Sequence, residues 1–327
     1  MINIIRAAHA ELKVRDLGAS RHFYVDVLGF HLEQETADAL YLRGLEERIH
    51  HSLVLRRAAV PALGHLSFRV ATPEDLEHAF RFYSARGLPT RWVAAGEEAG
   101  QGRALRVQDP MGFPMEYYCE MDAAERLLQR FDLYRGAQVM RMDHFNLFVP
   151  NCQAGYDWYA GELGFRCSEY TATEEAEPRV WAAWLFRKPN VHDVALMNGK
   201  GPRLHHLGFW VTDALSVLRA CDVLAASGYH ASIERGPGRH GISNAFFLYL
   251  RDPDGHRIEL FTGDYLTADP DLKPICWSIN DPRRQTFWGH AAPAAWFEEA
   301  SLVERIDGSG LMELQPPLLL ERPEHVT

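Results

Sequence analysis

The stretch His144-Phe-Asn-Leu147, with Trp158-Tyr-Ala-Gly-Glu-Leu-Gly-Phe165 behind it, decides the fold because the chain contains it twice. The earlier copy reads His9-Ala-Glu-Leu12, with Phe23-Tyr-Val-Asp-Val-Leu-Gly-Phe30 behind it. Both parts are displaced by 135 positions (144 − 9 and 165 − 30). A long internal repeat of this kind is the sequence signature of a duplicated structural unit.

Two further pairs of segments repeat at slightly larger offsets. Gly64-His65-Leu-Ser-Phe68 returns as His205-His206-Leu-Gly-Phe209, at an offset of 141 (206 − 65). Asp109-Pro-Met-Gly-Phe-Pro-Met-Glu116 returns as Asp252-Pro-Asp-Gly-His-Arg-Ile-Glu259, at an offset of 143 (259 − 116). The slow drift indicates small loop insertions in the second copy.

The repeats divide the chain into two homologous modules, which we place at residues 1–121 and 139–264. Within each module a strand, a helix and three strands follow one another twice. Helices are predicted at Leu17–Val27, where Gly29 can serve as the cap, and at Pro73–Arg86. The sequence therefore predicts an α+β fold built from four βαβββ units, two in each module.

Two segments lie outside the repeats. Residues 122–138 join the modules, and we predict a linker helix over Asp122–Arg135 because its apolar residues recur at helical spacing. Residues 265–327 are rich in Pro, Trp and Arg and show no sustained period, yet they carry many aromatic residues for a disordered tail. We expect this tail to pack over a module as a lid.

Composition and charge narrow the class of protein. The formal net charge is −10, which argues against a nucleic-acid partner. No apolar run approaches 18 residues and no signal-like N-terminus is present, which argues against a membrane span or secretion. The five cysteines show no C-x-x-C spacing, which is typical of free thiols in a reducing cytoplasm. We therefore expect a cytoplasmic protein.

The second module carries a set of residues suited to bind a metal. His144, His206 and Glu259 fall on three predicted strands, and alternation turns all three toward one face. Two imidazoles and one carboxylate leave coordination positions open for other ligands, an arrangement that suits Fe(II), and Mn(II) is also possible. His205 competes with His206, but neighbouring strand residues face opposite ways, and the repeat pairs His65 with His206. Core histidines without a metal are the alternative.

Further polar residues gather in the same module. His192, in a predicted strand, can pass protons, and Tyr249 can donate a hydrogen bond. The loop Glu234-Arg-Gly-Pro-Gly-Arg-His-Gly241 matches G-x-G-x-x-G only formally, because no strand and helix flank it. We interpret it instead as a basic loop that offers Arg235, Arg239 and His240 to an anion. From the tail, Arg283 and Arg284 would complete a carboxylate site, although a solvated basic loop is the alternative.

These motifs resemble the type I extradiol dioxygenases of the vicinal-oxygen-chelate superfamily, in particular the enzymes that cleave 3,4-dihydroxyphenylacetate. The resemblance rests on segments such as Asp143-His-Phe-Asn146, Ala182-Ala-Trp-Leu-Phe-Arg-Lys188, Val191-His-Asp193 and Asp252-Pro-Asp-Gly-His-Arg-Ile-Glu-Leu260. It covers nearly the whole chain. It implies 2,3-cleavage of a catechol carboxylate by O2 to a hydroxymuconic semialdehyde in bacterial degradation of aromatic acids. It also implies a homotetramer with Fe(II), or with Mn(II) as in close relatives.

The resemblance also implies a role for individual residues. The metal ligands would be His144, His206 and Glu259, with His192 as the acid and base. Tyr249 and Asn146 would donate hydrogen bonds beside the metal. The residues that shape the pocket and hold the substrate acetate would be Trp184, Arg235, His240 and Arg284.

One feature departs from this family. His9, His65 and Glu116 stand in the first module where the ligands stand in the second, although the first module of the family normally has no ligands. Arg106 replaces Tyr249, Arg43 replaces Trp184, and His51 pairs with His192. We expect one metal per chain, because a cation such as Arg106 disfavours a second metal. Two other functions stay open: an isomerase of the glyoxalase or epimerase type, and a protein that sequesters a ligand without a metal.

Overall fold

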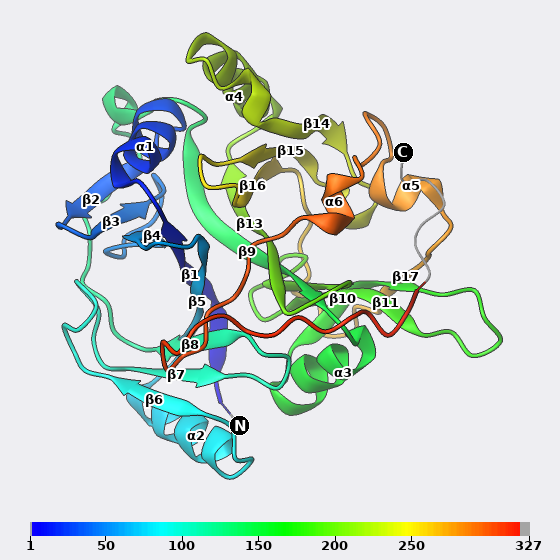
Figure 1. Cartoon of the computed structure of the whole chain (residues 1–327). Coiled ribbons are helices and arrows are strands. Elements are labelled where there is room, and N and C mark those ends of the chain that lie inside the picture. Colours follow the sequence, from blue (N-terminus) through cyan, green and yellow to red (C-terminus); the bar gives the residue numbers. More distant parts are fainter. Residues whose placement is uncertain (1, 321–327) are drawn as a thin grey trace. The chain divides into compact units, whose positions relative to one another are not determined.

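In the computed structural model, which describes residues 2–320, the chain forms two compact units. The first consists of the residues up to Asp143 together with Asp252–His256 and Ser301–Met312. The second consists of His144–Arg251, Arg257–Ala300 and the described residues after Met312. Each unit is built on one mixed sheet with helices beside it (Figure 1). The predicted α+β fold with two homologous modules is confirmed.

The first unit holds an eight-stranded sheet in the order β2-β3-β4-β1-β5-β8-β7-β6. Its first half comprises β1 (Ile4–Val14), α1 (Leu17–Arg21), the π-helix η1 (His22–Val27), β2 (His31–Glu35), β3 (Ala39–Arg43) and β4 (Leu53–Arg57). Its second half comprises β5 (Ala62–Val70), α2 (Pro73–Ser84), β6 (Thr90–Val93), β7 (Ala104–Gln108) and β8 (Pro114–Tyr118). The two halves join where β1 pairs with β5 in antiparallel fashion.

The second unit holds a nine-stranded sheet in the order β14-β15-β16-β13-β9-β12-β11-β10-β17. Its first half comprises β9 (Val139–Val149), α3 (Cys152–Tyr156), the π-helix η3 (Asp157–Glu162), β10 (Arg166–Ala172), β11 (Val180–Phe186) and β12 (Val194–Asn198). Its second half comprises β13 (Arg203–Val211), α4 (Ala214–Ala226), η4 (His230–Ser232), β14 (Ile233–Arg239), η5 (Ile242–Asn244), β15 (Phe246–Arg251) and β16 (Arg257–Thr262). Each half is again a βαβββ unit.

Local residues fix where the helices begin and end. The carboxylate of Asp16 accepts hydrogen bonds from the backbone N–H groups of Gly18 at 2.8 Å and Ala19 at 3.1 Å, which starts α1. The helical stretch ends at Gly29, whose φ of +84° suits glycine. The helix α2 starts with Pro73 at its first position, as the sequence predicts.

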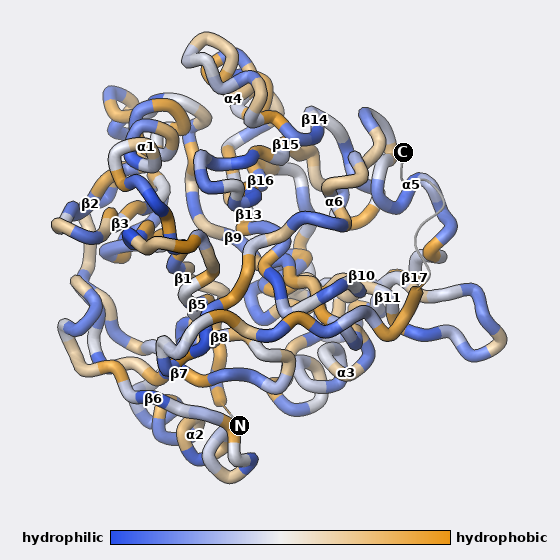
Figure 2. Tube along the Cα trace, viewed as in Figure 1, coloured by the Kyte–Doolittle hydropathy of each residue, from blue (hydrophilic) through white to orange (hydrophobic). Residues whose placement is uncertain are grey.

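The central strands of both sheets are buried on both faces. All residues of β9 from Met142 to Val149 are buried, and polar and apolar stretches alternate along the chain (Figure 2). A polar side chain on such a strand lies in the interior, where it needs a partner. The buried polar residues of β9, β13 and β16 are therefore candidates for a functional site.

The linker helix predicted over Asp122–Arg135 is wrong. Only the single 3-10 turn η2 (Phe131–Leu133) forms in that segment. Gln129 adopts a φ of +73°, which a right-handed helix cannot contain. Leu127 is buried while Phe131 is 72% exposed, so the apolar residues do not share the face that the spacing suggested.

His192 lies in a turn and not in the predicted strand, because β12 begins only at Val194. The carboxylate of Asp193 accepts hydrogen bonds from the backbone N–H groups of Arg187 at 2.6 Å and Lys188 at 3.0 Å. A side chain that bonds nearby backbone in this way competes with strand pairing and closes a turn.

The tail after Asp264 contributes to both units as far as residue 320, and residues 321–327 lie outside the described part. In the second unit it forms β17 (Ile275–Ser278), which pairs with β10, and the short helices α5 (Pro282–Gln285) and α6 (Ala295–Glu298). In the first unit, the backbone of Leu63 bonds with Leu302 and Glu304. No described helix is long and apolar enough to cross a membrane.

Candidate metal centre and its pocket

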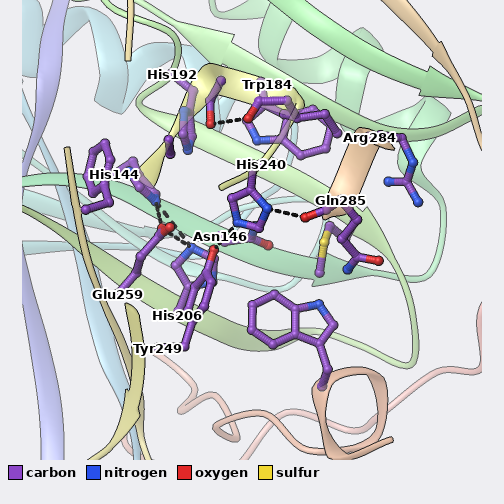
Figure 3. A pocket seen from close by; sticks show the side chains of 16 residues that line it. His144, Asn146, Trp184, His192, His206, His240, Tyr249, Glu259, Arg284 and Gln285 are labelled. Atoms are coloured by element: carbon purple, nitrogen blue, oxygen red, sulfur yellow. Dashed lines mark hydrogen bonds and ion pairs between the residues drawn. The ribbon is translucent and has the colours of Figure 1, made fainter. Parts of the chain in front are cut away.

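Three neighbouring strands of the second unit bring a cluster of ligand-type side chains together. His144 comes from β9, His206 from β13 and Glu259 from β16, and these strands are adjacent in the sheet. The three residues are only 1%, 2% and 3% exposed, respectively. Their ligand atoms converge on one point (Figure 3).

The distances within this cluster fit a shared metal ion. His144 Nε2 lies 3.2 Å from His206 Nε2 and 3.0 Å from Glu259 Oε2, and His206 Nε2 lies 3.2 Å from the same oxygen. Ligand atoms that share a metal at about 2.1 Å and at right angles lie about 3 Å apart. Two imidazoles and one carboxylate on one side of such an ion leave open positions on the other.

The protonation states also suit a metal. Burial lowers the pKa of His206 to about 4, so its ring is neutral at neutral pH. Burial acts to raise the pKa of Glu259, but hydrogen bonds and charge from His144 and His206 hold it well below its usual range. Neutral imidazole and ionised carboxylate are the forms that bind metals.

A glycine makes room for the first ligand. Any Cβ at position 208 would overlap the ring of His144. Gly208 stands two residues after His206 on the same strand face, and its register partner on β16 is Glu259. The absence of a side chain at Gly208 therefore allows the three ligand groups to meet.

His205 points away from the cluster. Its Nε2 bonds the backbone oxygen of Trp296 at 3.0 Å, and its ring packs against Phe148. Its Nδ1 lies 2.7 Å from Nδ1 of His206, so it orients the neighbouring ring through the nitrogen that faces away from the cluster.

The cluster opens into a pocket that contains most of the other residues singled out in the sequence. Asn146, Trp184, His192, His240, Tyr249 and Arg284 all line it together with the three ligand-type residues. The ring of His192 lies 3.9 Å from that of His144 between centroids. His192 Nδ1 and Asn146 Oδ1 have no hydrogen-bond partner within the described chain.

Hydrogen bonds fix the state of His240. Its Nδ1 contacts the backbone oxygen of Gln285, which can only accept, so Nδ1 carries the proton (Figure 3). Its Nε2 then accepts from the Tyr249 hydroxyl at 3.0 Å. Burial lowers the pKa of His240 to about 3 and raises that of Tyr249 well above its usual value. Both groups are neutral, so His240 adds no cation to the pocket, contrary to the basic loop that we expected.

The arginines differ in position. Arg284 lines the pocket and is 3% exposed, and burial lowers its pKa to about 10, which leaves it charged at neutral pH. Arg235 is equally buried and lies over the rings of Phe247 and Trp296, where it donates to the tail backbone at Gln285.

Three of the four proposed anion-binding arginines do not line the pocket, and Arg235 is one of them. The side chain of Arg283 is 68% exposed and pairs with Asp281 at 2.8 Å. Arg239 donates to the backbone oxygen of Asn244 at 2.7 Å. Arg283 and Arg284 are neighbours on the short helix α5, so they point in different directions, and only Arg284 points inward.

Several pocket residues escaped the sequence analysis because no motif marks them. They supply an apolar wall, a hydroxyl group and an amide group: Met197, Ile242, Ser243, Ala245, Gln285 and Trp296. The many aromatic residues of the tail were the only signal for Trp296, and they could not show which ring turns inward.

The chain matches the family described as the Glyoxalase/Bleomycin resistance protein/Dioxygenase superfamily over residues 6–117 and 141–260. The chain belongs to this superfamily. The two matched stretches correspond to the two internal repeats, and each contains one βαβββ pair.

Members of this superfamily with known activities are similar to the chain along most of its length. It is 35% identical to a manganese-dependent 2,3-dihydroxybiphenyl 1,2-dioxygenase of Geobacillus genomosp. 3, over 87% of this chain and 93% of the relative. It is 31% identical to a metapyrocatechase of Geobacillus stearothermophilus, over 91% and 93%.

Solved structures agree more closely. The homoprotocatechuate 2,3-dioxygenase of Brevibacterium fuscum, solved in an anaerobic complex with 3,4-dihydroxyphenylacetate, is 46% identical with a TM-score of 0.92, over 96% of this chain and 97% of that one. The enzyme of Arthrobacter globiformis is 43% identical with a TM-score of 0.92, over 96% of both chains.

The first unit of this superfamily member contains a second cluster of the same composition. His9 Nε2 lies 3.2 Å from His65 Nε2 and 3.0 Å from Glu116 Oε1, and His65 Nε2 lies 3.8 Å from that oxygen. Arg106 Nε lies 2.7 Å from the other oxygen of Glu116. The register partner of Glu116 is Arg106, whereas that of Glu259 is Tyr249, as the repeat alignment predicts.

Proposed function

We propose that the chain is an extradiol dioxygenase that opens the ring of 3,4-dihydroxyphenylacetate between C2 and C3 with O2, giving a hydroxymuconic semialdehyde. The observation that carries the proposal is the His144, His206 and Glu259 cluster in the lining of a pocket that also contains a buried arginine, Arg284. One end of the pocket suits a catechol on a metal, and the other suits a carboxylate.

We assign the metal to His144, His206 and Glu259, and the ion to Fe(II) or Mn(II), because this ligand set serves both. When bound, the ion would hold the two catechol oxygens and O2 together and let electrons pass between them. An isomerase of the glyoxalase type on this fold would need more carboxylate or amide ligands around the ion. A metal-free binding protein would have no use for three converging ligand atoms.

His192 is the proposed acid and base. Burial holds its pKa well below the usual range, so the ring is neutral and can accept a proton from a substrate hydroxyl. Its Nδ1 has no partner within the described chain, which leaves that nitrogen available to the substrate or to oxygen. The proton returns from His192 as the O–O bond breaks, so the residue ends the cycle unchanged.

The remaining pocket residues orient and enclose the substrate. Tyr249 keeps its proton because its pKa is raised, and its hydroxyl donates to His240 Nε2. It can donate toward the cluster only by turning that hydroxyl away from His240. Asn146 offers an unpartnered amide oxygen from the same strand as His144. Trp184 and Trp296 cover the ring and exclude water, while Arg284 binds the acetate. Arg235 does not line the pocket, but it lies over the ring of Trp296 and adds a second positive charge nearby.

The decisive experiment is turnover by protein loaded with a single metal. Apoprotein prepared with a chelator is reconstituted without oxygen, either with Fe(II) or with Mn(II), and mixed with 3,4-dihydroxyphenylacetate in aerated buffer. We expect one O2 consumed per substrate and a yellow product that incorporates both oxygen atoms. A reconstituted protein that binds the catechol but consumes no O2 would contradict the proposal.

The homotetramer, the cytoplasmic location and a role in the catabolism of aromatic acids are further parts of this proposal. The tetramer and the catabolic role are what the resemblance of the sequence motifs implies, and the cytoplasmic location rests on the five scattered cysteines. The mass of the purified protein in solution, measured by light scattering, tests the tetramer.

A further inference from the structure

Behind one wall of the pocket lies a carboxylate that the proposed reaction does not use. Glu169, on β10, is 1% exposed, and its register partner on β11 is the pocket residue Trp184. Among residues 2–320, the groups that act on its charge are a tyrosine, a tryptophan and a backbone N–H, with no lysine, arginine or histidine. A buried carboxylate without a cation needs strong hydrogen-bond donors to keep its place.

Glu169 finds three such donors, and they come from three separate segments. Its Oε1 accepts from the backbone N–H of Ser243 at 2.7 Å and from the Tyr265 hydroxyl at 2.6 Å. Its Oε2 accepts from the indole N–H of Trp277 at 2.6 Å. The side chain thereby joins β10 to the loop before β15, to the start of the tail and to β17.

The loop that Glu169 holds is part of the pocket wall. His240, Ile242, Ser243 and Ala245 line the pocket. Ser243 has a φ of +60° and Asn244 of +55°, a left-handed conformation that residues other than glycine adopt only where their surroundings impose it. The bond from Ser243 to Glu169 is one of the contacts that impose it.

The same loop is bonded to the part of the tail that carries Arg284, the residue proposed to bind the substrate carboxylate. The backbone N–H of Gly241 bonds the carbonyl oxygens of Arg283 and Arg284, each at 3.1 Å. His240 bonds the backbone oxygen of Gln285, as the dashed line in Figure 3 shows. A shift of the loop therefore moves Arg284 and His240 together.

We propose that Glu169 is a positioning residue that holds the loop 240–245 and the tail in one arrangement and so determines how tightly the substrate carboxylate binds. This inference rests on the proposed function only for the identity of the ligand. The metal ligands and His192 do not contact Glu169, so its effect falls on substrate binding and leaves the chemical step largely intact.

The test is the variant Glu169→Gln, which keeps size but replaces one acceptor oxygen with a donor. If the amide oxygen serves Ser243 and Tyr265, its NH2 group faces the indole N–H of Trp277, and two donors meet. We expect the KM for 3,4-dihydroxyphenylacetate to rise roughly 10- to 100-fold while kcat changes less than about threefold, with unchanged metal content.

A compensating variant separates positioning from a general loss of structure. Trp277→Phe in the Glu169→Gln background removes the opposing donor, so the double variant should recover a KM closer to that of the wild type than Glu169→Gln alone. Glu174→Gln is the matched control, because Glu174 also contacts β17, at Ser278, but is exposed and does not line the pocket. Its KM should match the wild type.

Hydrogen exchange supplies a readout that does not need activity. The backbone N–H of Ser243 should exchange faster in Glu169→Gln than in the wild type, while peptides from β9 and β13 stay unchanged. Wild-type protein that does not cleave the catechol would contradict the proposed function, but faster exchange at Ser243 would still support the positioning role.

Two results would overturn the inference. One is Glu169→Gln with wild-type KM and wild-type exchange at Ser243. The other is an equal loss of metal and activity that Trp277→Phe does not reverse. Should Glu169→Gln fail to fold, Tyr265→Phe removes a single donor and should still raise KM at constant metal content, and an unchanged KM in that variant would refute the role.

Discussion

The two units present the same three residue types, two histidines and a glutamate, in surroundings of opposite character. In the first unit the carboxylates Glu11, Glu98 and Glu116 are met by cations. Arg106 pairs with Glu116 at 2.7 Å and Glu98 at 3.3 Å, and Arg56 pairs with Glu98 and Glu11, each at 2.6 Å. Lys13 adds a third cation, at 2.7 Å from Glu11. In the first unit, these three cations balance the three carboxylates without a metal.

The second unit lacks this compensation. In the described part of the chain no lysine or arginine pairs with Glu259, whose ion-pair partners are His144 and His206. Where the first unit has Ser67, which donates to Glu116, the second has Gly208, which has nothing to donate. The surroundings of a His-His-Glu cluster, more than the cluster itself, therefore decide whether it needs a metal to balance its charge.

The largest expected difference follows from the same substitution made in each unit. His206→Ala removes one of three metal ligands and should abolish both metal binding and turnover. His65→Ala, its counterpart, should leave about one metal per chain and most of the activity, because the first unit is balanced by Arg106. Metal analysis and O2 uptake on both variants test this.

His205→Ala is the control within the second unit. It removes the ring that orients His206 but no ligand, so most of the metal should remain when metal is supplied in excess. Equal metal loss in His205→Ala and His206→Ala would mean that the wrong imidazole was chosen. If His65→Ala lost its activity and the wild-type chain bound two metal ions, the proposed difference between the two units would be wrong.

The next effect concerns His192, which has a counterpart in His51. His192→Phe should slow turnover by roughly 100- to 10,000-fold, as is typical for loss of a general acid and base, while metal and substrate binding persist. His51 is fully buried and bonds His50, so His51→Phe should leave kcat nearly unchanged in protein that folds. Single-turnover kinetics would separate chemistry from binding, and normal kcat in His192→Phe would remove it from the mechanism.

A smaller effect tests the carboxylate end of the pocket. Arg284→Met, which keeps much of the side-chain length but loses the charge, should weaken binding of 3,4-dihydroxyphenylacetate by about 1.5–3 kcal/mol, roughly 10- to 100-fold. Plain catechol should be a poor substrate for the wild type and should be affected little by the substitution. Arg283→Met is the matched control, since Arg283 faces solvent. Comparable kcat/KM for the two catechols in the wild type would contradict the carboxylate site.

The sequence predicted the arrangement of the backbone better than the directions of individual side chains. The duplication predicted the fold and placed His144, His206 and Glu259 on three strands with their side chains on one face, because a repeat constrains register and alternation constrains sidedness. It could not show that Arg283 turns outward while Arg284 turns inward, since a short helix in a tail has no periodicity to read. Nor could it reveal the role of Glu169, whose partners lie 74 to 108 positions away in the chain.

The linker shows that a local sequence pattern does not by itself determine the backbone structure. Apolar spacing over Asp122–Arg135 matched a helix, but tertiary contacts took precedence over it, with Leu127 buried and Phe131 exposed. Local propensity is a weak guide where a segment is held at both ends by other elements.

The last prediction concerns stability and not turnover, and it is the most direct test of the comparison between the units. Arg106→Tyr gives the first unit the residue that the second has at this position, and it removes the cation beside Glu116. Loss of a buried ion pair should lower the free energy of unfolding by about 3 kcal/mol without added metal. The same change leaves His9, His65 and Glu116 with surplus negative charge, which should favour a divalent ion. A ligand at 100 times its Kd restores about 2.7 kcal/mol, so added Mn(II) should recover most of the lost stability in this variant.

The measurement is thermal unfolding with and without Mn(II) in a His206→Ala background, where the second unit no longer binds metal. Arg106→Lys keeps the charge and should show no such recovery, and adding His65→Ala to Arg106→Tyr should abolish it. Stabilisation by Mn(II) with Arg106 intact would show that the arginine does not exclude a metal, and the contrast between the two units would then lie elsewhere.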